Sequence, residues 1–128
     1  MLYGMSKTTN FTNLIVWRSA HALVLVIYNL TQNYPKSELF VLSPQMRRAA
    51  ISITSNIAEG YGRKGNKEKI YFFNVAIGST REIQNQLYVS RDLGYLTSDK
   101  CTELVNFGNE IIKILYTIIR IIKDKTIS

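Results

Sequence analysis

The stretch from about residue 98 to residue 123 has the most regular hydrophobic pattern in the chain. Its apolar residues recur at alternating steps of three and four, which places them along one side of an α-helix. They form two neighbouring rows: Leu104, Phe107, Ile111, Ile114, Ile118 and Ile121 in the first, and Val105, Ile112, Leu115, Ile119 and Ile122 in the second. Only a narrow polar strip remains, so this helix must bury most of its circumference.

This apolar face is wider than one bundle core needs. The first row can pack inside a bundle while the second faces another subunit. We therefore predict that the interface of a homo-oligomer is formed by the second row, Val105, Ile112, Leu115, Ile119 and Ile122. The alternative is a C-terminal helix that is buried deeply within its own bundle.

Three other segments have helical spacing, over about residues 13–33, 44–61 and 67–93. Pro35 ends the first, Ser43 and Pro44 form a start signal for the second, and Gly94 closes the third. The predicted core-facing residues are Leu14, Trp17, His21, Val24 or Leu25, and Tyr28 in the first segment, Met46, Ala50, Ile53 and Ile57 in the second, and Phe72, Ala76, Ile83 and Leu87, widened by Ile70, Phe73 and Ile77, in the third.

Four helices of about 20 residues, each roughly 30 Å long and joined by short loops, predict an all-α fold, an antiparallel up-down four-helix bundle. Residues 1–128 are thus predicted to be one domain, with helices over about 13–33, 44–61, 67–93 and 98–123. Gly78 and Ser79 lie in the middle of the third helix, where glycine costs about 1 kcal/mol relative to alanine. We therefore expect another helix to approach closely at this pair.

The composition fits a folded globular protein, because 46% of the residues are apolar and 20% are charged. The longest apolar run, residues 22–28, is far shorter than the roughly 20 residues that span a bilayer, and the N-terminus has no secretory pattern. We expect a cytoplasmic protein without a membrane segment. Cys101 is the only cysteine, so neither an intrachain disulfide nor a cysteine zinc cluster can form within one chain.

Sixteen Lys and Arg residues against nine Asp and Glu give a formal net charge of +7, and the excess is unevenly placed. A basic cluster lies between residues 47 and 69, where the only acidic residues are Glu59 and Glu68. Such a cluster is typical of proteins that bind a polyanion. We predict that nucleic-acid phosphates are bound by Arg47, Arg48, Arg63, Lys64 and Lys67. The alternative is a solvated basic surface that only keeps the protein soluble.

The sequence GYGRKG, residues 60–65, has the glycine spacing of a dinucleotide-binding loop. That loop requires a strand before the glycines and a helix after them. Because a helix is predicted before Gly60, we interpret the glycines as the end of one helix and the turn into the next, with Asn66 as a cap. Arg63, Lys64 and Lys67 would still lie beside a helix N-terminus, which favours an anion.

The residues needed for catalysis are missing or isolated. His21 is the only histidine, and no serine or cysteine has a base and an orienting partner at a suitable spacing. The Glu-x-x-His pairs of di-iron bundles do not occur. We predict that the protein is not an enzyme and has no metal site or cofactor. Tyr61 and Tyr71 accompany the basic cluster and could stack bases, but for each we favour structural packing, and we assign Phe72 to the core.

Several motifs together resemble one known family, over roughly residues 11–122. They are Trp17-x-x-Ala20, Tyr34-Pro35-x-x-Glu38, the block QMRRAAISITSNIAEG at residues 45–60, Ala76-x-Gly78-Ser79, Gln86-Leu87 and Leu93-Gly94-Tyr95-Leu96, together with Arg63, Phe72 and Glu82. The chain resembles the "four helix bundle protein" family, whose members were first noticed as reading frames inside intervening sequences of bacterial large-subunit ribosomal RNA genes. Its departures from the family pattern, Thr80, Ile83 and Asn85, do not affect the expected fold.

The resemblance implies a four-helix bundle that assembles as a homopentamer, a hollow, barrel-like ring. The family is also similar in fold to the accessory variability protein of diversity-generating retroelements, a basic pentamer that binds nucleic acid and a reverse transcriptase. Our leading hypothesis is therefore a non-catalytic accessory protein that binds RNA or DNA mainly through phosphates, with a reverse transcriptase as a candidate partner. The alternative is a protein-interaction scaffold without nucleic-acid binding.

Overall fold

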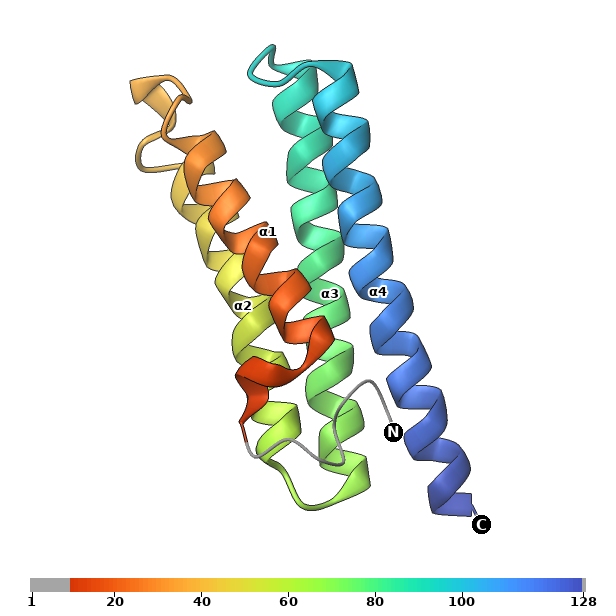
Figure 1. Ribbon diagram of the computed structural model, residues 1–128. Coiled ribbons are helices and arrows are strands. Elements are labelled where there is room, and N and C mark those ends of the chain that lie inside the picture. Colours follow the sequence, from red (N-terminus) through yellow and green to blue (C-terminus); the bar gives the residue numbers. More distant parts are fainter. Residues whose placement is uncertain (1–9, 128) are drawn as a thin grey trace.

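Four long helices make up most of the protein. The computed structural model describes residues 10–127, and Figure 1 shows its helices α1 (Ile15–Thr31), α2 (Leu42–Gly62), α3 (Asn66–Asp92) and α4 (Ser98–Ile127). Two short 3-10 helices, η2 (Phe11–Asn13) and η3 (Lys36–Glu38), precede α1 and α2. Residues 10–127 contain no strand, and the predicted all-α fold is confirmed.

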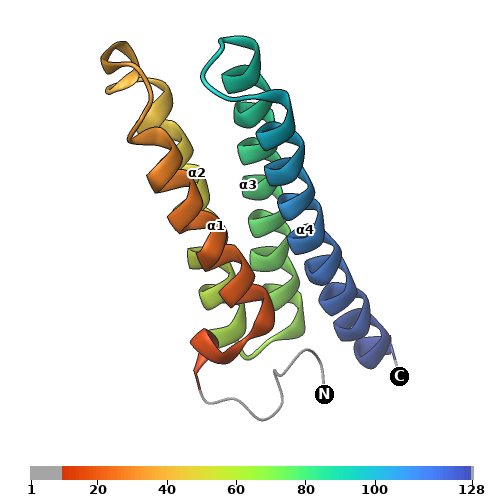
Figure 2. The same ribbon diagram turned by 45° about the horizontal axis from the view of Figure 1, so that its top comes forward.

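Consecutive helices run in opposite directions. α1 packs on α2, α2 on α3 and α3 on α4, and α1 also contacts α4, which closes the bundle. Figures 1 and 2 show the α2–α3 connection and the C-terminal end of α4 at one end of the molecule. The α1–α2 and α3–α4 connections lie at the other end. None of the described helices has the length and hydropathy needed to cross a bilayer.

The cores of α2 and α3 agree with the sequence pattern except at Phe72, although the predicted core residue Ile70 is only half-buried where it packs against the core. The predicted residues of α2, Met46, Ala50, Ile53 and Ile57, are all fully buried. In α3 the fully buried phenylalanine is Phe73, whereas Phe72 is half-buried, so the assignment of Phe72 to the core is wrong. Adjacent helical residues point about 100° apart. Spacing alone could not decide which of two neighbouring phenylalanines faces inward.

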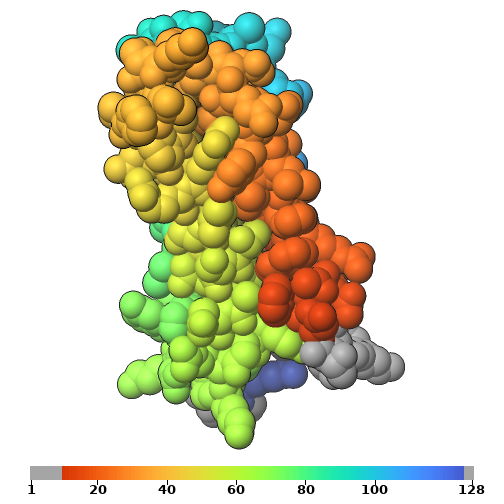
Figure 3. Space-filling model, turned by 90° about the vertical axis from the view of Figure 1, so that its left-hand side faces the viewer, coloured from red at the N-terminus to blue at the C-terminus, as the bar shows by residue number. Residues whose placement is uncertain are grey.

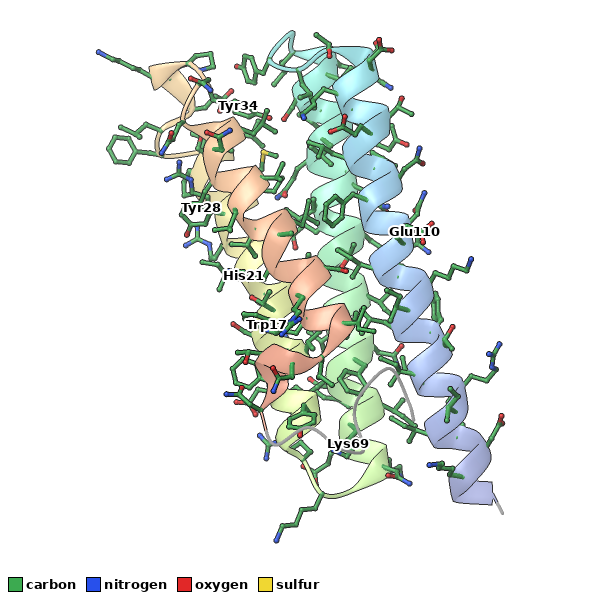
Figure 4. All side chains as sticks on the ribbon, in the orientation of Figure 1. Trp17, His21, Tyr28, Tyr34, Lys69 and Glu110 are labelled. Carbon is green, nitrogen blue, oxygen red and sulfur yellow. The ribbon has the colours of Figure 1, made fainter. Side chains whose placement is uncertain are left out.

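The predicted core side of α1 is confirmed only in part, because Leu14 and Val24 are buried and Trp17 and Tyr28 pack against the core, whereas His21 does not. The buried residues of α1 are Val16, Ala20, Leu23, Val24, Ile27 and Thr31. His21 and Leu25 are exposed, and Trp17 and Tyr28 are half-buried. The His21 ring stacks on the Trp17 ring with 4.7 Å between centroids, and both residues are labelled on α1 in Figure 4. The segment is apolar on nearly every side, so its pattern permits either face.

Both apolar rows of α4 are largely covered within the protomer. The predicted interface row is buried, with exposed fractions of 8% for Val105, 5% for Ile112, 0% for Leu115, 5% for Ile119 and 5% for Ile122. α4 contacts both α3 and α1, so two rows face two neighbours of the same chain. The α4 apolar residues that stay half-buried are Phe107, Ile114 and Ile121, which belong to the first row and recur every seven residues.

Two of the predicted helix ends are wrong. α2 begins at Leu42, with Val41 as its N-cap and no side-chain cap, so Ser43 lies inside the helix. α3 has Gly65 rather than Asn66 as its N-cap. The prediction that Gly94 closes α3 is confirmed, because its φ of 84° is the left-handed conformation that glycine adopts without strain.

The glycines inside the helices differ in their surroundings. α2 continues through Gly60 and Gly62 to the C-cap Arg63, so the first two glycines do not form the turn. A Cβ atom at Gly60 would lie 2.7 Å from Cε1 of Phe73, which shows that this glycine admits the ring. A Cβ atom at Gly78 would have no neighbour within 4 Å. No other helix is close at Gly78 in the described protomer, whereas at the adjacent Ser79 α2 approaches closely, with Ser79 Oγ 2.7 Å from Ser52 Oγ.

Candidate nucleic-acid interface

Basic residues gather at the end of the bundle where α2 turns into α3 and α4 ends. Figure 1 shows these two places at the same end, and in Figure 3 the α2–α3 connection forms the lower tip of the molecule. The basic residues of these segments are Arg63, Lys64, Lys67, Lys69, Arg120, Lys123 and Lys125, against the acidic residues Glu59, Glu68 and Asp124. We call this part of the surface the basic end.

The opposite end is electrically balanced. Its basic residues Lys36, Arg91 and Lys100 lie among the acidic residues Glu38, Asp92, Asp99 and Glu103. Arg91 Nε is 2.9 Å from Asp92 Oδ1, and Lys100 Nζ is 2.9 Å from Glu103 Oε2. The positive potential of the described chain is therefore concentrated at the basic end, where a long polyanion would be attracted.

Lys64 and Lys67 are the most available cations of the α2–α3 connection. Both are exposed, and within residues 10–127 neither ammonium takes part in a hydrogen bond or an ion pair. They flank the N-terminus of α3, whose partial positive charge disfavours cations. These two lysines thus add positive charge where the helix itself gains nothing from it. By contrast, Lys123 and Lys125 in the last turns of α4 complement the helix dipole.

Arg63 is held by acidic neighbours and by an aromatic ring. Its Nη2 is 3.0 Å from Glu59 Oε2, and its Nη1 is 3.7 Å from Glu68 Oε2. The guanidinium carbon lies 5.0 Å from the centroid of the Phe72 ring. Exposed ion pairs of this kind are worth below about 1 kcal/mol, so an incoming phosphate can compete with the carboxylates.

Lys69, labelled in Figure 4, connects α3 to the end of α2. Its Nζ donates hydrogen bonds to the carbonyl oxygens of Tyr61, at 2.8 Å, and Gly60, at 3.3 Å. These carbonyls belong to the last turn of α2, where side chains often complete the hydrogen bonding, and the Gly60 carbonyl also accepts from the backbone N–H of Arg63 at 3.3 Å. Burial lowers the pKa of the Lys69 ammonium. Lys69 is therefore a structural residue of the turn, a role that its position in a charge cluster did not indicate.

Arg47, which we predicted to bind phosphate, instead joins α2 to the C-terminus of α1. Its Nε donates to Thr31 Oγ1 at 2.9 Å, and its Nη2 donates to the carbonyl oxygen of Tyr28 at 3.3 Å. The guanidinium carbon also lies 4.6 Å from the centroid of the Tyr28 ring. Because these contacts use its charge within the protomer, the geometry assigns Arg47 to the fold rather than to the interface.

Arg48 is exposed but distant from the other candidates. It lies 15 residues before Arg63, the C-cap of the same helix, which corresponds to roughly 22 Å along the axis. Its neighbours around a shallow depression are Gln45, Ala49, Ser52 and Glu82. The structure therefore brings together Arg63, Lys64 and Lys67, and places Arg47 and Arg48 elsewhere.

An aromatic pair lies next to the three clustered cations. Tyr71 is 62% exposed, and its ring meets the Phe72 ring edge to face, with 5.1 Å between centroids and 83° between planes. Together with Arg63, Lys67 and Glu68 the pair lines an open depression of about 400 Å³. In the sequence, Lys67 and Tyr71 are four residues apart, as are Glu68 and Phe72, so each pair lies on one side of a helix. This signal of a shared surface was missed because Phe72 had been assigned to the core. Tyr61, by contrast, is half-buried.

Within the described range no group of three or more His, Cys, Asp or Glu side chains is placed to hold a metal ion. Cys101 is buried, and its Sγ donates to the carbonyl oxygen of Leu87 at 3.6 Å. The chemistry offered by this end of the molecule is thus that of positive charge beside aromatic surface.

The comparisons with known proteins agree with the fold. A family model described as "23S rRNA-intervening sequence protein" matches residues 12–117. The chain belongs to this family. A solved structure, a protein with unknown function from the S23 ribosomal protein family of Bacteroides thetaiotaomicron VPI-5482, is similar with a TM-score of 0.73 and 26% sequence identity, over 82% of this chain and 98% of that chain. No curated protein matches.

The part of the chain that defines it as a 23S rRNA-intervening sequence protein includes the α2–α3 connection and the aromatic pair. The last turns of α4, which hold Arg120, Lys123 and Lys125, lie beyond residue 117. The basic end is thus built partly from residues that the family model matches and partly from the last turns of α4, which follow the matched residues.

Proposed function

We propose that this protein is a non-catalytic, homo-oligomeric accessory protein that binds RNA or DNA mainly through phosphates. The observation that carries the proposal is the one-sided charge distribution. Lys64 and Lys67 are exposed at the basic end without ion pairs in the described chain, while the opposite end is balanced. Membership of a family described by its link to ribosomal RNA supports a nucleic-acid ligand. No base-specific motif is present, so the binding is driven by counterion release.

Binding should depend on Lys64 and Lys67. For the double variant Lys64→Ser, Lys67→Ser we expect the slope of log affinity against log salt to fall by about two for duplex DNA, because each phosphate contact contributes about 0.9. We expect no loss of folding stability, since both lysines flank the positive end of a helix dipole. Titration of labelled RNA and DNA at several salt concentrations measures the salt dependence. Thermal unfolding monitored by circular dichroism measures the stability.

The matched control is Lys36→Ser, Lys100→Ser, which removes the same charge from the opposite end. It should leave affinity almost unchanged. An equal loss in both double variants would show that net charge, and not the basic end, governs binding. The proposal would be contradicted if the wild-type protein failed to bind nucleic acid at low salt, or bound it with an affinity independent of salt.

Assembly into a ring, for which the family resemblance favours a pentamer, presents several copies of the basic end to one ligand. Several copies on one ligand raise the apparent affinity without any new kind of contact. The half-buried residues of α4, Phe107, Ile114 and Ile121, recur every seven residues and support a helix-to-helix interface. They replace the row at 105, 112, 115, 119 and 122, which is buried within the protomer.

We expect the purified protein to have a mass of about five times the 14.7 kDa of one chain. Ile114→Ser should shift the population toward single chains, because it removes apolar surface from the half-buried stripe. Tyr116→Ser, on the other side of α4, is the control and should keep the oligomer. Sedimentation or light scattering measures the masses. A single-chain mass for concentrated wild-type protein would contradict the assembly.

A second candidate function is a scaffold that binds a protein partner, for which a reverse transcriptase is the suggested class. The observation in its favour is an apolar tip in the α1–α2 connection, where Leu39 is 60% exposed, Phe40 88% and Val41 62%. Exposed apolar clusters of this kind mark interaction sites. The scaffold predicts no nucleic-acid binding at low salt, which distinguishes it from the first function. A neighbouring reverse transcriptase gene with repeat templates would favour it.

A further inference from the structure

Tyr71 is a large aromatic side chain on the outer side of α3. It is 62% exposed and precedes the buried Phe73 by two residues, which places it about 200° around the helix from that core residue. The Phe72 ring supports it from the side at 83°, and the Arg63 guanidinium in turn covers the Phe72 ring. A large aromatic side chain is thus held on the surface by a neighbour that is itself held by a cation. Such a platform suits a flat ligand.

The depression at this platform is suited to a base rather than to a phosphate. Its lining combines the Tyr71 and Phe72 rings with the cations Arg63 and Lys67 and the carboxylate of Glu68. Glu68 repels a phosphate at the centre of the depression, and Arg63 is already 3.7 Å from that carboxylate. A neutral aromatic ring meets no such repulsion. Phosphates are better accommodated at the edge, where Lys67 and Lys64 are exposed.

The spacing of charge and ring fits one nucleotide. Lys67 and Tyr71 are four residues apart on α3, so their Cβ atoms lie on the same side of the helix about 5–6 Å apart. A phosphate at Lys67 therefore brings its base over Tyr71. In a duplex the bases are stacked on one another and cannot reach a surface ring, whereas in a single strand they can.

We propose that an unpaired nucleobase stacks on Tyr71, and that the interface therefore selects single-stranded over double-stranded nucleic acid. This inference rests on the proposed function and names its ligand class. Stacking on aromatic side chains is tolerant of sequence, because every base has a π-face. Tyr71 adds affinity for single strands, and Lys64 and Lys67 act on every polyanion.

The test compares four ligands: a 15-nucleotide single strand made as RNA, the same strand made as DNA, the 15-base-pair DNA duplex of that sequence, and heparin, a polyanion without bases. Tyr71→Ser should weaken binding of the single strands about 5- to 150-fold, the range expected for loss of one stacked base. Duplex and heparin affinities should change less than about twofold. Tyr71→Phe should bind single strands like the wild type, because it keeps the aromatic face.

Tyr88→Ser is the matched control. Tyr88 is 43% exposed near the other end of α3, and the guanidinium carbon of Arg91 lies 5.0 Å from its ring centroid, so it is a second surface aromatic with a cation beside it. Its replacement should leave all affinities unchanged. Comparison of the RNA and DNA strands shows whether either sugar is preferred. Circular dichroism verifies that the variants are folded.

Three outcomes overturn the inference, and together they separate it from the proposed function. If the wild type binds duplex and heparin, and Tyr71→Ser binds single strands equally well, stacking is wrong while phosphate binding stands. If Tyr71→Ser loses affinity for heparin as strongly as for single strands, its effect is a general change of the surface. If the wild type binds none of the ligands at low salt, the proposed function and the stacking both fail.

Discussion

Phe73→Ala is expected to lower the free energy of unfolding by about 3–5 kcal/mol, the range for removing a fully buried phenylalanine. The Phe73 side chain is fully buried, and it fills the space that a side chain at Gly60 would occupy across the contact between α2 and α3. The two helices cannot move together to fill this space without losing their other contacts, so a cavity remains. Urea unfolding followed by circular dichroism measures the change.

Phe72→Ala is the comparison for this variant. Phe72 is adjacent in sequence and of the same residue type, but it is half-buried. Its loss should cost clearly less, about 2 kcal/mol or below, because less apolar surface returns to water. A larger cost for Phe72→Ala than for Phe73→Ala would mean that α3 turns a different side toward the core.

Gly60→Ala is expected to destabilise the protein by about 1–2 kcal/mol. Alanine favours a helix by up to about 1 kcal/mol over glycine, so propensity alone predicts the opposite sign. The added Cβ, however, would lie 2.7 Å from Cε1 and 2.9 Å from Cδ1 of Phe73, whose ring is fully buried. Overpacking of this kind costs typically about 1–3 kcal/mol. Urea unfolding measures the sign of the change.

Two further variants test this explanation. Gly78→Ala adds the same methyl group to α3 where no atom lies within 4 Å, so it should raise stability by about 0.5–1 kcal/mol. Phe73→Leu removes the ring that Gly60→Ala meets, and the double variant Gly60→Ala, Phe73→Leu should be more stable than the sum of its single changes implies. Additive changes would show that the clash is not the cause.

The number, order and approximate extent of the helices could be predicted because the apolar positions of α2 and α4 repeat with helical spacing. The core side of α1 could be predicted only in part, at Leu14 and Val24, since residues 14–30 are apolar on nearly every side. The predicted N-terminus of α2 was wrong for a local reason. Ser43 and Pro44 satisfy the start rule, but the helix gains one more residue, Leu42, and Ser43 is buried inside it.

The basic cluster was visible in the sequence, but the use of each cation was not. Arg47 and Lys69 look like surface charges, yet each donates hydrogen bonds to carbonyl oxygens near the end of a helix. Such contacts depend on how the helices meet in space. Likewise, Gly60 fits a turn in the sequence, whereas its actual role depends on Phe73, which lies 13 residues further along the chain.

The unequal ends of the bundle have a consequence for any closed assembly of this chain. Rotational symmetry about a single axis carries each subunit's basic end to the same side whenever the bundles stand along that axis. A ring of this kind has two unlike rims, one cationic and one bearing the Phe40 tips. A nucleic acid lying across the first rim would leave the second free, so two different ligands could be held at once without competing for the same surface.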